Sequence, residues 1–341
     1  MMRSTLLLAA SATVIGAAAN AQETSSPFSA EFSVELQSDF TFDSSDPAAE
    51  INNTYATIEG ALSFSFTRNT SLNATLLIEQ VMDPTSDSFL EDHGFYAEEL
   101  FFAHDFGKAQ VVLGKFNPAF GSAWDVAPGI YGADFAEDYE ITEKLGAAVV
   151  VPFAAGAGEH ELSFAVFQAD RTILSDSIGT ERGQNSLPAG GVSNTSSPES
   201  VALSVAGTFG ATGYNVGIQY QAKGRGDAAD QTGAVLGLTH TVETGSFPLE
   251  LLAEVAWFDE FDGTRDSASY GTLGLAAPVG PVTVSAVYSL RDVQTMPTDH
   301  LVTVSAEMEL FENFTGAIGY RYGDEGGEDS HTIGTLFAYE F

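Results

Sequence analysis

Apolar and polar residues alternate along most of this chain, and the alternation is clearest near its N-terminal end. Phe28, Phe32 and Phe40 fall on one parity, whereas Glu31 and Glu35 fall on the other. Because successive side chains of a β-strand point to opposite faces, this period of two predicts a strand with an apolar face and a charged face. The segment is longer than an average soluble strand and suits a tilted strand that crosses a bilayer, which needs ~9–11 residues.

The same alternation recurs to the C-terminus and predicts about sixteen strands. It is weakest in 94–106 and 268–277, where the phase is ambiguous. The predicted strands span 28–42, 54–67, 71–82, 94–106, 110–116, 140–153, 160–171, 200–209, 214–223, 232–243, 248–258, 268–277, 281–291, 299–310, 314–322 and 331–341.

The links between the predicted strands are alternately short and long. An up-and-down transmembrane barrel shows this arrangement, with tight turns on the periplasmic side and long loops outside the cell. A soluble β-sandwich has no physical reason to sort its loops in this way. The pattern therefore predicts an all-β fold, a transmembrane antiparallel up-and-down β-barrel. The long links are acidic and polar and cover 43–53, 83–93, 117–139, 172–199, 224–231, 259–267, 292–298 and 323–330.

Acids on the polar faces decide which side of the strands meets water. A dry core cannot hold them, because each unpaired buried charge costs roughly several kcal/mol. A water-filled lumen can hold them, with the apolar face turned outward to lipid. Aromatic residues also gather near the predicted strand ends, as expected for a girdle at the membrane interface. The acids are Glu31, Glu35, Glu79, Glu161, Glu250, Glu254, Glu307 and Glu309, and the aromatic residues include Phe28, Tyr220, Trp257, Phe314 and Tyr339.

An apolar stretch precedes the first predicted strand. It follows a short basic start and ends in Ala19-Asn20-Ala21, which places small residues at the two positions that a signal peptidase reads. The stretch is shorter than the ~20 apolar residues of a membrane-spanning helix. It therefore predicts a signal peptide at residues 1–21, removed by cleavage, and a single barrel domain at residues 22–341.

The chain is strongly acidic. Its 47 Asp and Glu residues outnumber its 12 Lys and Arg residues, for a formal net charge of −35. This charge disfavours nucleic-acid binding, which needs basic patches that neutralise phosphates. It is easier to accommodate when most acids lie in loops or along a wet channel. The absence of cysteine from the sequence excludes a disulfide framework, thiolate catalysis and cysteine-ligated zinc.

The last residues alternate aromatic and non-aromatic side chains and stop on phenylalanine. Phe337, Tyr339 and Phe341 fall on one parity of the final strand. A terminal aromatic strand of this kind resembles the assembly signal of bacterial outer-membrane proteins, which implies recognition by the barrel-assembly machinery. An even number of strands returns the last strand to the side where the first one starts. Strand 331–341 should therefore pair with strand 28–42 and close the barrel.

The chain resembles the Gram-negative porins, in architecture over its whole mature length and in sequence detail over one stretch. That stretch runs from Gly114 through Pro118 to Gly121 and continues into a long segment, 117–139, after the fifth predicted strand. In sixteen-stranded general porins the third external loop follows the fifth strand and folds into the barrel to narrow the pore. The resemblance therefore implies a homotrimeric porin with 117–139 as its pore-constricting loop. The sequence departs from the general porins in its acidity and in lacking a dense arginine cluster on one strand.

Charged residues of this segment and of the predicted wall are candidates for the pore constriction. Acids at a narrow point attract cations and repel anions, and loop acids opposite wall bases would set a transverse field across the pore. Two plainer interpretations stay open: the loop acids are solvated charges or helix caps, and the wall bases pair with acids on neighbouring strands. The loop acids are Asp125, Asp134, Glu137 and Asp138, and the lumen-facing bases are Lys144, Arg171, Lys223, Arg291 and Arg321.

The leading hypothesis is a porin of the bacterial outer membrane that conducts small hydrophilic solutes and ions by passive diffusion, with a weak preference for cations. Outer-membrane lipids are its expected surroundings. No cofactor, bound metal or nucleic-acid partner is expected. The six histidines lie scattered near predicted strand ends, and none forms a metal pair at helical spacing.

Other functions stay open. A solute-selective channel would keep the barrel and add a binding site in the lumen, although the scarcity of lumenal bases argues against phosphate as its solute. A non-conducting structural or adhesive barrel would bind a partner through 172–199. Nothing in the sequence points to the Ser and His arrangement that a barrel enzyme needs. The acidic runs 83–92 and 324–329 match no calcium loop and are interpreted as solvated charge.

Overall fold

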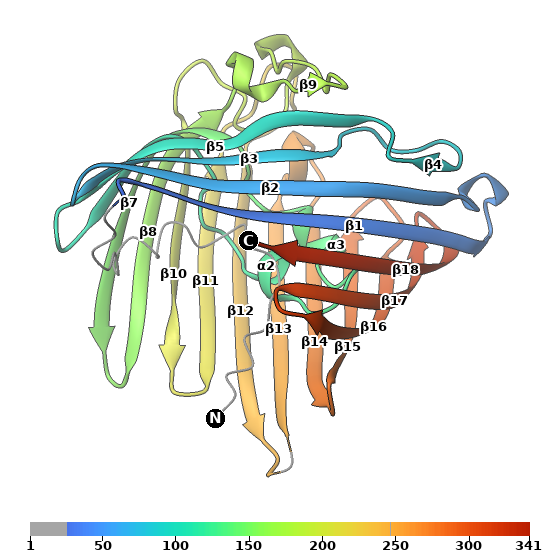
Figure 1. The fold of residues 1–341 in the computed structure, drawn as a ribbon. Coiled ribbons are helices and arrows are strands. Elements are labelled where there is room, and N and C mark those ends of the chain that lie inside the picture. The colour runs from blue at the N-terminus through green and yellow to red at the C-terminus, as the bar shows by residue number, and fades with distance from the viewer. Residues whose placement is uncertain (1–25, 246) are drawn as a thin grey trace.

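The computed structural model describes residues 26–245 and 247–341, and these residues form a sheet that closes into a barrel (Figure 1). Two of its eighteen strand elements, β4 (Ser88–Phe89) and β9 (Ile178–Gly179), are short pieces within loops. The other sixteen pair antiparallel with their neighbours and make the wall, so the predicted barrel is confirmed. The predicted signal peptide lies outside the described residues.

Each predicted strand corresponds to one strand of the wall, with ends that shift by a few residues. The wall strands are β1 (Phe28–Ser44), β2 (Asn52–Thr67), β3 (Thr70–Gln80), β5 (His93–Asp105), β6 (Gln110–Phe116), β7 (Lys144–Ala155), β8 (Gly158–Ala169), β10 (Ser200–Phe209), β11 (Thr212–Gln221), β12 (Gln231–Glu243), β13 (Pro248–Asp259), β14 (Ala268–Val279), β15 (Val282–Val293), β16 (Asp299–Phe311), β17 (Phe314–Glu325) and β18 (Glu328–Glu340).

Helices are short and occur between the wall strands. They are η2 (Pro47–Ala49), α2 (Ala123–Val126), α3 (Asp134–Glu137), η3 (Ile173–Ser175), η4 (Leu187–Ala189) and η5 (Phe261–Gly263). Within the described part of the chain, none of them has the length and apolar composition of a membrane-spanning helix.

The first and last strands form the seam of the barrel, as the sequence predicted. β1 pairs antiparallel with β18 from Ser33 opposite Glu340 to Ser44 opposite Ser330. Beyond this ladder, the backbone N–H groups of Phe32 and Phe341 donate to each other's carbonyl oxygens, both at 3.0 Å. Their rings stack with centroids 5.4 Å apart. Phe341 therefore extends the pairing of the seam by one further residue pair, which leaves, among the described residues, only the first residues of β1 without a partner on this side.

The faces of the strands are reversed relative to a soluble β-protein. On β13, Val255 and Trp257 are 58% and 49% exposed, whereas Glu254, on the opposite face of the same strand, is 1% exposed. The apolar residues Phe28 and Phe40 of β1 are likewise more than half exposed, at 51% and 53%. The apolar parity therefore points out of the barrel, which is the arrangement of a transmembrane barrel in lipid.

Short turns and longer connections alternate around the barrel, with one exception among the predicted long loops. The prediction of a loop over 323–330 is wrong, because β17 and β18 continue through it and meet in a two-residue turn. Gly326 and Gly327 have φ of +64° and +86°. Positive φ at both central residues is what a type I′ hairpin turn requires. The Gly-Gly pair was therefore a stronger local signal than the acids that flank it.

Candidate functional site

The segment between β6 and β7 enters the barrel and carries α2 and α3 (Figure 1). Residues 117–143 are here called the constriction loop. Pro118 ends the extended run of β6, and Gly121 and Gly129 adopt positive φ of +76° and +88°. These positions favour glycine and let the chain turn sharply, so the loop folds into the lumen instead of continuing the wall.

A buried carboxylate on β13 holds the start of the constriction loop. Glu254 is 1% exposed and accepts hydrogen bonds from the backbone N–H groups of Ser122, at 2.9 Å, and Ala123, at 3.0 Å. The hydroxyls of Ser122 and Tyr139 donate to the same carboxylate at 2.8 and 2.7 Å. Hydrogen bonds to an ionised acceptor are stronger than neutral ones. These four hydrogen bonds attach the loop to β13, and none of their donors is a basic side chain.

Aromatic side chains of the constriction loop pack on the inner face of β13 and β14. Tyr139 and Phe120 of the loop meet Phe258 of β13 and Tyr270 of β14, with ring centroids 5.1–6.5 Å apart. The same buried cluster includes small residues of β7, β8 and β10, which leave room for the loop. The constriction loop therefore packs directly on the inner face of β13 and β14, a contact that the sequence did not predict.

Further bonds carry the loop across to the opposite wall. The Tyr131 hydroxyl donates to Asp39 of β1 at 2.5 Å, and the backbone N–H of Ile130 donates to the Ser305 hydroxyl of β16 at 3.1 Å. Tyr131 lies against Gly334 of β18, where a Cβ atom would collide with the phenolic oxygen. Gly334 therefore leaves the space that the tyrosine occupies.

Two of the predicted loop acids meet two of the predicted wall bases. Asp134 pairs with Arg321 at 2.8 Å, and Asp138 pairs with Arg291 at 2.7 Å. Arg321 also binds Glu325 at 2.6 Å. These acids and bases therefore join the loop to β15 and β17, and they neutralise one another instead of facing across an open gap.

The other predicted bases lie elsewhere. Lys144 is the first residue of β7. Arg171 and Lys223 lie two residues past the ends of β8 and β11, so placing them on the wall strands was wrong. The Arg171 guanidinium donates to the carbonyl oxygen of Thr195, at 2.9 Å, within the external loop that follows β8.

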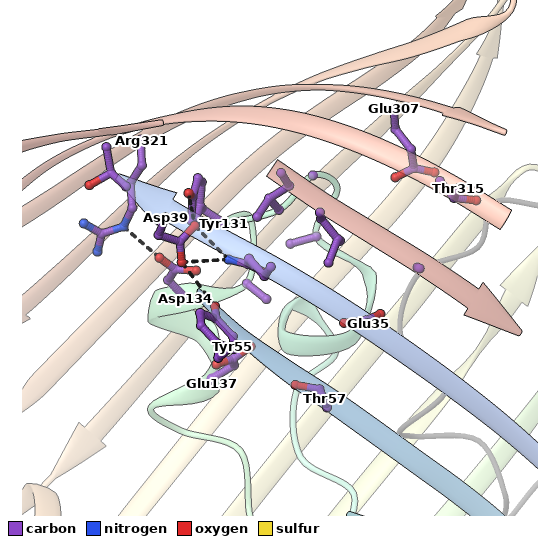
Figure 2. Close-up of a pocket in the computed structure, with 18 of the residues that line it drawn as sticks. Glu35, Asp39, Tyr55, Thr57, Tyr131, Asp134, Glu137, Glu307, Thr315 and Arg321 are labelled. Atoms are coloured by element: carbon purple, nitrogen blue, oxygen red, sulfur yellow. Dashed lines mark hydrogen bonds and ion pairs between the residues drawn. The ribbon is translucent and has the colours of Figure 1, made fainter. Parts of the chain in front are cut away.

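An open cavity remains between the constriction loop and the wall formed by β1, β2 and β16–β18. Its volume is about 540 Å³. Figure 2 shows Asp39, Tyr55, Tyr131, Asp134 and Glu137 grouped where the loop meets β1 and β2. Seven acids and one base line the cavity. The acids are Glu35, Asp39, Asp125, Asp134, Glu137, Glu307 and Glu340, and the base is Arg321.

Enclosure by the barrel makes the loop acids easier to protonate. Burial raises the pKa of Asp125 to about 6. Burial raises the pKa of Glu137 to about 7, and the nearby Asp134 and Asp138 carboxylates add to this shift. The Glu137 side chain is exposed toward the lumen, so confinement within the wall is the source of its desolvation. Among the described residues, the side chains of Asp125 and Glu137 form no ion pair or hydrogen bond that would oppose this shift.

A second buried charge network lies where the constriction loop leaves the wall, and the sequence analysis missed it. The Lys115 ammonium is 1% exposed and binds Glu143 at 2.6 Å, Asp170 at 3.4 Å and the carbonyl oxygen of Leu174 at 2.7 Å. Lys115 falls within the porin-like stretch of the sequence, but no local pattern names its partners. They come from two different external segments.

The external loop 170–199, between β8 and β10, covers the part of β5 that lies beyond the end of β6. β6 ends at Phe116, and β9 pairs with Gly94 and Phe95 on the side of β5 that β6 no longer covers. Arg182 holds the segment that contains β9 in place. Its guanidinium binds both oxygens of Glu143 at 2.8 and 2.6 Å and lies 3.6 Å from the ring centroid of Tyr96. Lys115, Glu143 and Arg182 therefore act together to close the wall beside the loop.

Comparison with known proteins supports the fold. No family model and no curated protein matches the sequence. OprB of Pseudomonas putida is similar in structure, with a TM-score of 0.62 and 9% identity over 92% of this chain and 94% of that one. OmpF of Salmonella typhi gives 0.62 and 9% over 92% and 97% of the two chains. An anion-selective porin from Comamonas acidovorans gives 0.57 and 15% over 92% and 99%. At these identities the likeness shows the fold, a sixteen-stranded barrel of the outer-membrane porin type.

Proposed function

We propose that this protein is a porin of the bacterial outer membrane, a water-filled channel through which small hydrophilic solutes and ions diffuse passively. The observation that carries the proposal is the polar cavity beside the constriction loop, inside a barrel whose apolar residues face outward. By its resemblance to the general porins, the protein is a homotrimer in outer-membrane lipid. In the same proposal, the barrel-assembly machinery inserts it by reading Phe337, Tyr339 and Phe341.

The channel prefers cations in this proposal. Seven acids line the cavity, and its single base, Arg321, is held by Asp134 and Glu325. Excess negative charge within low-dielectric walls concentrates cations and excludes anions. Asp125 and Glu137 carry the most weight among the loop acids, because Asp134 and Asp138 are paired with arginines.

Planar-bilayer recording of the purified protein tests both parts of the proposal. The expected result is stepwise ion conductance with a reversal potential that favours potassium over chloride. Absence of conducting steps would refute the channel, and a chloride preference would refute the cation preference alone.

Glu137→Gln should lower the potassium-to-chloride permeability ratio by about twofold, because it removes one of the few unpaired negative charges at the constriction. The substitution keeps the size of the side chain and removes its charge. Reversal potential in a salt gradient is the measurement. Glu243→Gln, near a turn and outside the cavity, is the matched control. An unchanged ratio in Glu137→Gln would mean that the constriction lies elsewhere.

The cation preference should fall as the pH is lowered from about 8 to about 5. Because the pKa values of Glu137 and Asp125 are raised to about 7 and about 6, both groups are charged at the upper end of this range and neutral at the lower end. The preference is therefore present above these pKa values and is lost below them. Reversal potentials measured across the range would show the change, and Glu137→Gln should remove its upper part. A flat profile in the unmodified protein would contradict the assignment.

A further inference from the structure

The seven short turns at the end of the barrel opposite the Gly326-Gly327 turn contain two bases, on neighbouring turns. Arg68 lies between β2 and β3, and Lys108 lies between β5 and β6. The turns touch, because the backbone N–H of Asp105 donates to the carbonyl oxygen of Asn69 at 2.8 Å and the Asn69 side-chain amide donates back to the Asp105 carbonyl oxygen at 2.9 Å. Both basic side chains are exposed, and neither forms an ion pair within the described residues.

A chain of hydrogen bonds orients a histidine beside these turns. The backbone N–H of Asn69 donates to the Thr67 hydroxyl at 3.2 Å, which donates to the Thr70 hydroxyl at 3.1 Å. The Thr70 hydroxyl lies 2.8 Å from Nδ1 of His104, and this hydrogen bond fixes the orientation of the ring. In the described part of the chain, Nε2 of His104 has no hydrogen-bond partner, so this nitrogen is free to bind a ligand.

Exposed aromatic rings adjoin the same spot on the outer wall. Phe66, Phe102 and Phe106 are 53%, 50% and 67% exposed. The rings of Phe66 and Phe102 stack at 6.0 Å, and the Phe106 ring meets the His104 ring edge-on at 4.4 Å. These rings belong to the apolar outer face. The polar donors at the turns therefore border a surface suited to acyl chains.

We infer that Arg68, Lys108 and His104 form a binding site for the headgroup of an anionic membrane phospholipid, with the acyl chains against the three phenylalanines. Charge complementarity carries this choice of partner, because an anionic headgroup is repelled by most of a chain with a net charge of −35. The carboxylate of Asp105, beside these turns, accepts a hydrogen bond from the backbone N–H of Gly107 at 2.6 Å. Long basic side chains reach along a membrane surface to headgroups. The inference rests on the proposed function only in assigning this end of the barrel to the periplasmic leaflet.

Native mass spectrometry of the detergent-purified full chain tests the site with phosphatidylglycerol and phosphatidylcholine as the lipids added. The expected result is preferential retention of phosphatidylglycerol. In Arg68→Gln/Lys108→Gln this retention should fall by roughly thirtyfold, on the scale that two bases contribute at an anionic surface. His104→Gln should give a smaller loss. Arg225→Gln/Arg265→Gln, which removes two bases from external loops, is the matched control and should retain the lipid.

Three outcomes would overturn the inference. They are equal retention in the two double variants, no difference between the two lipids, and displacement of the lipid by millimolar inorganic phosphate, which would indicate a simple anion site. Folding of each variant is checked by far-ultraviolet circular dichroism, which does not depend on conductance and which the turn substitutions should leave unchanged. Lipid retention without any conductance would refute the channel and leave the lipid site standing, so the two proposals fail separately.

Discussion

Replacing Glu254 with alanine is expected to convert a steady open channel into one that fluctuates between conductance sublevels. The substitution removes the acceptor shared by Ser122, Ala123 and Tyr139. Buried donors left without a partner cost about 1–3 kcal/mol each, so the start of the constriction loop would lose its hold on β13. The loop would then sample positions nearer the open cavity. Single-channel recording measures the resulting open-state noise.

A second readout follows the loop directly. The chain has no cysteine, so Val126→Cys, at an exposed position on α2, accepts a single spin label. The label should be more mobile in the Glu254→Ala background than in the parent. Glu250→Ala is the matched control, because Glu250 lies on the same strand and the same face four residues earlier. Glu254→Gln should be intermediate, since it keeps one accepting oxygen. Quiet channels and an immobile label in Glu254→Ala would show that the aromatic cluster alone holds the loop.

Lys115→Met should lower the free energy of unfolding by about 3 kcal/mol, the scale on which removing one member of a buried ion pair destabilises a protein. Methionine fills similar space but leaves Asp170, whose side chain is 1% exposed, without a base. Glu143 loses less, because Arg182 still binds it. Equilibrium unfolding in urea, with the protein in detergent micelles, measures the change.

Two variants make the Lys115 prediction specific. Lys223→Met removes an exposed base from an external loop and should change the unfolding midpoint little. Lys115→Met/Asp170→Asn should be more stable than Lys115→Met, because it removes the uncompensated charge. If the double variant were the less stable of the two, the hydrogen bonds that Asp170 accepts from Thr172 would outweigh the cost of its uncompensated charge.

Local patterns were sufficient for the wall. Alternation is a direct consequence of strand geometry, so 28–42 could be identified as a strand with an outward apolar face before any partner was known. The pairing of the first and last strands also followed, because an even strand count leaves them side by side. Turn chemistry was equally local: Gly326-Gly327 carried the hairpin signal, and only the acids around it suggested a loop.

The sequence by itself therefore determined the barrel, the inward face of the acids and the position of the constriction loop in the chain. Only the tertiary structure decided which charges meet. Asp134 forms an ion pair with Arg321, which lies 187 residues further along the chain. Glu254 accepts a hydrogen bond from Ser122, which lies 132 residues earlier. Such contacts depend on the path of a loop that has no repeating pattern. They also depend on small residues such as Gly334 that open space for it, and no period in the sequence encodes that space.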